Sequence, residues 1–263
     1  MLIDPLEEMT RELELPAGCD QWGMLALRPD MTTTNGSRPT PGNPLPASCE
    51  PPTVAKTWHG LSWYEGSANT VVLAAYSESD VIETNLTYDS YWVEMDRLHT
   101  VTVGTVQVVK ILSGAEVLRD HGQKADLCGA ALQAMDLSDV DLTGADLTGA
   151  DLERSCLQRS NLSNTLLVDT CARQAQFGAA NLTGARLDNS RAPGADLSFA
   201  DLRGAKMRGT VLVGACLAFS DLRGADLSGV FAAMATFRGA DLTGANLDGG
   251  HLTGANFQDA KGI

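Results

Sequence analysis

The sequence has few of the features that mark enzymes, metal sites or membrane proteins. Its four His and six Cys lack the paired spacing of zinc ligands, such as C-x-x-C. A glycine-rich phosphate loop, a nucleophile elbow and a pair of catalytic carboxylates are also missing. The apolar runs are short and the N-terminus is acidic, so neither a membrane span nor a signal peptide is predicted. We therefore expect a non-enzymatic protein with no catalytic, cofactor-binding or metal-binding residues.

Aromatic residues are scarce and unevenly placed. All four Trp and all four Tyr lie in residues 1–123, whereas all six Phe lie in residues 124–263. The first half carries 17 acids and 7 bases, and the second half 16 acids and 12 bases. Because the composition changes so sharply, two domains are predicted, at 1–123 and 124–263.

A five-residue register runs through the second half. Every fifth residue from Leu127 to Phe257 is Leu, Phe, Met or Ala, which gives 27 consecutive centres. Five matches neither the 3.6-residue period of a helix nor the alternation of a strand. The register instead predicts short extended segments joined by tight corners, and each unit buries its apolar side against its neighbours.

The other positions of the unit support this interpretation. A small residue, mostly Ala, lies two places before each centre, and Gly lies two places after it in 14 of the 27 units, as tight corners with positive φ require. An Asp or Asn directly before the centre is expected to hydrogen-bond the local backbone in an Asx arrangement.

The units read Ala-Asp-Leu-Thr-Gly at 145–149 and Ala-Asn-Leu-Thr-Gly at 180–184. Over residues 125–260 this pattern resembles the pentapeptide-repeat family. The resemblance implies an all-β fold: a right-handed, four-sided parallel β-helix with four pentapeptides per coil. The 27 units would then make about seven coils, with ~4.8 Å between stacked strands.

With four units per coil, centres twenty residues apart share a face of the β-helix. The predicted core includes Leu142, Leu162, Leu182, Leu202, Leu222, Leu242, Phe177 and Phe237. Ala172 and Ala232 are each followed by one of these Phe centres, as a tube of fixed packing density requires. Ala192 has no such neighbour, so we expect a loosely packed coil there.

The first half is expected to be an acidic, β-rich head that caps the β-helix. Residues Asp4–Glu7 predict the start of a short N-terminal helix. Residues 29–53 form a Pro-rich arm, which is either a disordered linker or an arm ordered by a partner. Strands are predicted at Thr70–Tyr76, Ser90–Met95 and His99–Leu112, the last with a bulge at Gly104.

Two sets of outward residues are candidate interaction surfaces. The first is an acidic ladder along the uniform Leu face, formed by Asp141, Asp201, Asp221 and Asp241. A column of acids resembles that of Qnr-type relatives, which are thought to mimic DNA for gyrase. Arg203 and Arg223 stand beside the ladder and partly neutralise it, which favours the simpler interpretation that Asp is the repeat's usual residue.

The second set is an apolar patch at positions that should be polar. It consists of Phe199, Val211, Val213, Phe219, Phe231 and Met234. Apolar patches of this kind mark interfaces, although the head domain could also cover this one. Phe199 and Phe219 are one coil apart, in register to stack.

These observations predict a protein–protein interaction or scaffolding protein that displays side chains on a rigid β-helix. The expected partner is a protein, either a different one or a second copy bound through the patch, with no direct binding of nucleic acid or membrane. Two alternatives are a DNA-mimic modulator of gyrase and a structural or cement protein of a virion. Unpaired, reduced cysteines predict a cytoplasmic location, or a virus particle under the last alternative.

Overall fold

The structure, a computed structural model, describes residues 21–26, 44–45, 53–55, 70–76, 81–85, 100–103, 106–113, 118–120 and 122–263. Contacts divide the chain into two compact units, one ending at Val117 and the other running from Leu118 to Ile263. We keep the predicted domain limits, 1–123 and 124–263, as a proposal.

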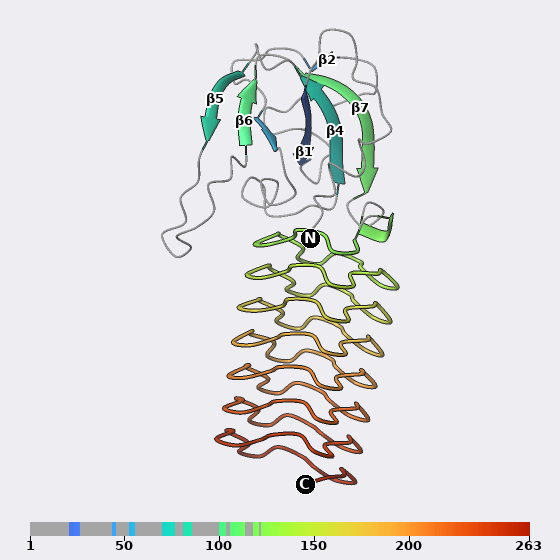
Figure 1. The fold of residues 1–263 in the computed structure, drawn as a ribbon, viewed down its shortest axis with the longest axis vertical. Helices are drawn as coiled ribbons and strands as arrows, with labels where there is room; N and C mark the ends of the chain where they lie inside the picture. The colour runs from blue at the N-terminus through green and yellow to red at the C-terminus, as the bar shows by residue number, and fades with distance from the viewer. Residues whose placement is uncertain are drawn as a thin grey trace. The chain divides into compact units, whose positions relative to one another are not determined.

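Within the described residues, the first unit contains a seven-stranded antiparallel sheet (Figure 1). Its strands are β1 (Gln21–Ala26), β2 (Pro44–Leu45), β3 (Thr53–Ala55), β4 (Thr70–Tyr76), β5 (Val81–Asn85), β6 (Thr100–Val103) and β7 (Val106–Ser113). Their order in the sheet is β2-β7-β4-β1-β3-β6-β5. Four strand spacings separate β6 from β7, about 19 Å in a flat sheet, yet the link from Val103 to Val106 spans at most about 11 Å. The sheet must therefore be strongly curled.

The predicted strands of the first half have different outcomes. The strand at Thr70–Tyr76 is confirmed as β4. The single bulged strand at His99–Leu112 is wrong, because β6 and β7 are separate strands with different neighbours. The expected N-terminal helix and the strand at Ser90–Met95 lie outside the described residues. Within the Pro-rich arm, β2 pairs with β7, so this part of the arm is ordered by the chain itself.

The second unit is a solenoid of stacked coils, drawn from green to red in Figure 1. Parallel β-bridges join each outward residue before a centre to the residue twenty positions later, from Asp126 with Asp146 to Asp241 with Lys261. Twenty residues, or four pentapeptides, therefore complete one turn. The β-solenoid implied by the sequence pattern is the fold of this unit.

The centres of the repeat point inward and fill the solenoid. Each of the eight predicted core residues, Leu142, Leu162, Leu182, Leu202, Leu222, Leu242, Phe177 and Phe237, is at most 1% exposed. Burial of each such side chain contributes about 1.5–3 kcal/mol. The Ala centres before the two Phe residues, Ala172 and Ala232, are buried as well.

Each pentapeptide satisfies all of its backbone N–H groups. In the unit centred on Leu147, the N–H groups of Leu147 and Gly149 donate to carbonyls of the next coil (2.7 and 2.8 Å). The N–H of Asp146 donates to the preceding coil (2.9 Å), and that of Ala150 closes the turn onto the Leu147 carbonyl (2.9 Å). The one remaining N–H, that of Thr148, donates to Oδ1 of Asp146 (2.9 Å). The side chain before the centre thus completes the backbone pairing.

The corners of the coils have a left-handed backbone. The residue two places after the centre has a positive φ in all 27 units, between 55° and 72°. Combined with the hydrogen bond from the next residue to the carbonyl of the centre, this positive φ matches a type II turn. Gly fits this conformation without strain, which explains its frequency at the fifth place of the repeat.

Ser190, two places before Ala192, provides a test of core packing. Its buried hydroxyl has no hydrogen-bond partner among the described residues, whereas the Ser160 hydroxyl donates to the Leu157 carbonyl (2.6 Å). We expect Ser190→Ala to raise the free energy of unfolding by about 1 kcal/mol, because an unsatisfied buried hydroxyl is destabilising, and Ser160→Ala to lower it. Urea denaturation of both variants measures the difference. Equal destabilisation by the two substitutions would show that the Ser190 hydroxyl has a partner, such as a buried water.

Candidate interaction surfaces

The solenoid presents its outward residues in columns, and two of its four sides carry the candidate surfaces. We call the side around the centres Leu142 to Leu242 the ladder face. We call the side formed by the units centred on Leu132, Leu152, Ala172, Ala192, Leu212, Ala232 and Leu252 the patch face. On both sides, consecutive coils bring residues twenty positions apart into adjacent strands.

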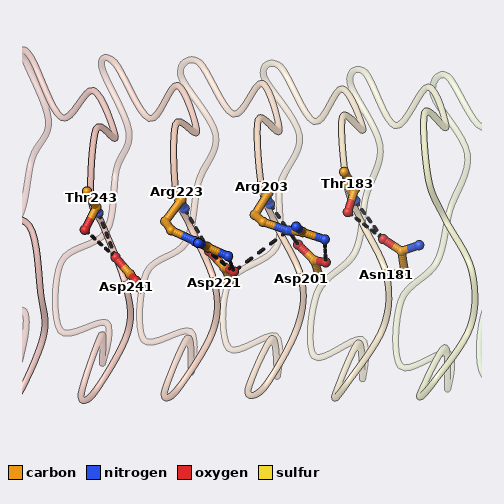
Figure 2. A network of polar contacts seen from close by, with 8 residues as sticks. All are labelled: Asn181, Thr183, Asp201, Arg203, Asp221, Arg223, Asp241 and Thr243. Atoms are coloured by element: carbon orange, nitrogen blue, oxygen red, sulfur yellow. Dashed lines mark hydrogen bonds and ion pairs between the residues drawn. The ribbon is translucent and has the colours of Figure 1, made fainter.

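On the ladder face the acids bind donors of their own pentapeptide (Figure 2). Arg203 binds Asp201 through two bonds, Nε to Oδ1 at 2.8 Å and Nη2 to Oδ2 at 2.6 Å. Arg223 binds Asp221 in the same way, and Arg203 also lies 3.8 Å from Oδ2 of Asp221. The hydroxyl of Thr243 donates to Asp241 at 2.6 Å. The column is therefore a chain of local pairs rather than a row of free carboxylates.

The same carboxylates serve the backbone. In all fourteen units with Asp or Asn before the centre, the side-chain oxygen accepts the N–H two residues later. On the ladder face, Asn161 and Asn181 make this bond as the acids do. Because a neutral amide performs the same task, the position selects for an acceptor and not for negative charge.

Hydrogen bonds keep the ladder acids ionised. The Arg203 and Arg223 guanidinium groups lower the pKa of Asp201 and Asp221, chiefly through side-chain hydrogen bonds. The Thr243 hydroxyl lowers the pKa of Asp241. At Asp141, desolvation raises the pKa, but the hydrogen bonds from Thr143 and Gln123 outweigh it and the net pKa is lowered.

The apolar patch falls into two groups. Val211, Val213, Phe231 and Met234 lie on the patch face, where Val213, Phe231 and Met234 are 43%, 44% and 71% exposed and Val211 is half-buried. Phe199 and Phe219 occupy corners that follow the next side of the solenoid, at 64% and 52% exposure. Their rings stack with centroids 5.3 Å apart and planes 13° from parallel.

Two contacts at the patch were not predicted from the sequence. The Phe231 ring stacks on His251, one coil further, with centroids 4.8 Å apart. The Phe219 ring lies over Gly239, where an added Cβ would come within 2.6 Å of two ring carbons. Gly239 is thus needed for its close approach to the ring as well as for its positive φ. Both contacts join residues twenty positions apart, so the five-residue period combined with the coil length could have indicated them.

Other kinds of site are not found in the described part of the chain. Cys128, Cys156, Cys171 and Cys216 are free thiols on different coils. No cluster of three or more His, Cys, Asp or Glu residues that could hold a metal ion occurs among the described residues. Within the same residues, none of the helices has the length and hydropathy of a membrane span.

The repeat defines the family. The profile of the Pentapeptide repeats family matches in eight copies, over residues 125–164, 160–198, 173–209, 194–229 and 220–259. These segments together cover just over half of the chain. The chain therefore belongs to the pentapeptide-repeat family.

Several solved structures are similar to this chain. HetL, a pentapeptide repeat protein involved in heterocyst differentiation regulation from the cyanobacterium Nostoc sp. strain PCC 7120, is 30% identical over 52% of this chain and 74% of HetL, with a TM-score of 0.39. QnrB1, a plasmid-mediated fluoroquinolone resistance protein, is 24% identical over 48% of this chain and 76% of its own, with a TM-score of 0.38. The Nostoc PCC 7120 protein alr5209 is 42% identical over 30% of this chain and 65% of its own, with a TM-score of 0.29. No curated protein sequence matches the chain.

The pairing on the ladder face predicts a pH dependence of stability. Since the folded pKa of Asp201 and Asp221 lies below the ordinary value of 3.8, their contribution is complete above that value and is lost as the pH falls through the folded pKa. In the double variant Asp201→Asn/Asp221→Asn, the amide oxygens retain the backbone bond but do not titrate. We expect the variant to lose less stability than the wild type between pH 5 and pH 3, measured by urea denaturation.

A matched control is Asp169→Asn/Asp248→Asn, because these two carboxylates accept no hydrogen bond within the described residues. This variant should follow the acid sensitivity of the wild type. If the ladder variant also follows the wild type, the Arg–Asp pairs do not couple protonation to folding.

Proposed function

We propose that this chain is a non-enzymatic interaction or scaffolding protein that binds a protein partner through the apolar patch. The observation that carries the proposal is the exposure of Phe231 and Met234, at 44% and 71%, on strands whose backbone is fully paired. Large apolar side chains in this setting contribute little to folding and gain most from burial against another surface. Since the stacked strands fix the backbone positions beneath the patch, little conformational entropy is lost on binding.

The acidic ladder is the weaker candidate surface. A DNA mimic for gyrase would need unneutralised charge repeated along the rod. Here two of the four ladder acids are bound by arginines of the same face. Each ladder carboxylate is also engaged by the backbone, as Asn is at the equivalent positions. We therefore place the interaction on the patch.

The finer architecture is also part of the proposal. We infer about seven right-handed coils, because 27 units occur at four per turn, and a β-rich head that caps the first coil. A cytoplasmic location, where the free thiols would persist, and a virion cement role remain predictions. The cement role depends on the Pro-rich arm, most of which lies outside the described residues.

A photo-crosslinking experiment tests the interaction proposal. Met234→p-benzoylphenylalanine places a crosslinker within the patch, and Thr243→p-benzoylphenylalanine places the same group on the ladder face as a control. In the cells that produce the protein, we expect a discrete protein adduct from position 234 and none from position 243. Adding Phe231→Asp should abolish the adduct while changing the free energy of unfolding by less than about 0.5 kcal/mol, because the ring is partly exposed.

The proposal would be contradicted by an absence of protein adducts at position 234 or by equal adducts from both positions. An adduct of two copies of this chain and an adduct with another protein both support an interface at the patch. The mass of the adduct distinguishes them.

A further inference from the structure

The patch face differs from the rest of the solenoid in its charge. The chain contains 33 Asp and Glu residues and has a net charge of −14. From Cys171 to Gly254, however, no outward position of the patch face carries a carboxylate. An acid-free strip on so acidic a protein is a place where an incoming negative charge is not repelled by its immediate neighbours.

Two arginines on this strip are exposed and unpaired. Within the described part of the chain, neither Arg173 nor Arg191 makes an ion pair or a side-chain hydrogen bond. Elsewhere on the solenoid, arginines lie within 3.3 Å of a carboxylate, namely Arg159, Arg186, Arg203, Arg208 and Arg223. The guanidinium groups of Arg173 and Arg191 therefore retain their full capacity to bind carboxylates through paired hydrogen bonds.

The arginines and the apolar residues form one continuous surface. Consecutive β-bridges join Cys171 to Arg191, Arg191 to Val211, and Val211 to Phe231. Arg173 follows Cys171 by two residues, and Met234 follows Phe231 by three. The patch face is thus cationic at its middle coils and apolar at the next two coils along the axis.

The spacing of this surface sets the size of its ligand. Two coil steps separate Arg191 from Phe231 and three separate the coil of Arg173 from that of Phe231, about 10 to 14 Å at ~4.8 Å per step. An extended chain advances about 3.3 Å per residue, so three to five residues span this distance.

We propose that the patch face binds an extended acidic–apolar segment of a partner protein. Asp or Glu side chains of the segment pair with Arg173 and Arg191. A large apolar side chain, about three to five residues away, packs on Val211, Phe231 and Met234. The inference rests on the proposed function and adds the chemistry of the partner: the apolar contacts supply burial, and the arginines select acidic sequences and fix their register.

Selection from a library of short random peptides displayed on phage, with the full-length protein as bait, tests the proposal. We expect the enriched peptides to combine Asp or Glu with an aromatic or aliphatic residue at the stated separation. Synthetic copies of these peptides should bind the Arg173→Glu/Arg191→Glu variant about tenfold to a hundredfold more weakly than the wild type. Binding to the wild type should also weaken as the salt concentration rises.

The matched control is Lys206→Glu/Lys261→Glu, which changes the net charge by the same amount at two exposed cations on other sides of the solenoid. This control should bind the selected peptides about as well as the wild type. Equal loss in both charge-reversed variants would indicate unspecific attraction and would overturn the proposal.

The other outcomes separate this inference from the proposed function. Enriched peptides that are apolar without acids, and that lose binding only in Phe231→Asp, would overturn the acidic partner but leave the interface at the patch. A salt-sensitive dimer of the protein that dissociates in Arg173→Glu/Arg191→Glu would make a second copy the occupant and would also overturn the partner proposed here. Peptides whose binding is unaffected by any of these variants would contradict both proposals.

Discussion

Parallel pairing of each strand with the strand twenty residues later is the constraint on which the solenoid depends. The backbone of one coil can donate to the next only if every coil has the same length and phase. This requirement places an inward side chain at every fifth residue and a left-handed corner two residues after it. It also leaves one N–H of the unit without a backbone partner, and the Asp or Asn before the centre accepts it. Core, corners and consensus acid are therefore consequences of one hydrogen-bonding scheme.

The same scheme decides which surface features carry functional information. Acids that recur because the backbone needs an acceptor are poor evidence for a charged binding surface, and on the ladder face several are also paired with arginines. A residue that departs from the repeat without serving the backbone is better evidence. Phe231, Met234, Arg173 and Arg191 are such residues. They lie on one side of the solenoid, where their columns bring together apolar contact and unpaired positive charge.

The repeat made the solenoid predictable, because one period fixes which side chains are buried. Leu202 and Phe177 were assigned to the core from spacing alone, and the Asx bonds followed from residue type. The stacking of Phe231 on His251 and the seating of Phe219 over Gly239 were missed, since they depend on the direction in which each side chain leans along the axis. That Arg173 and Arg191 are unpaired likewise depends on distances to carboxylates, which a sequence does not contain.

The first half was less predictable because its strands pair over long distances without a repeat. The β-branched run at Thr70–Tyr76 was sufficient to identify β4. The reversal of alternation at Gly104 was interpreted as a bulge, although it marks the passage from β6 to β7. Locally the two cases look alike, and only the neighbours in the sheet distinguish them. Similarly, no local signal indicated that Pro44–Leu45 pairs with β7.

The dependence of the solenoid on register can be measured most directly by inserting residues after Gly204 and following amide hydrogen exchange. A one-residue insertion turns every later centre away from the core, whereas insertion of a complete twenty-residue coil preserves the phase. We expect the single insertion to abolish protection from Ala205 onward and the coil-length insertion to retain it. Equal protection of this segment in both proteins would contradict the proposed role of the five-residue register.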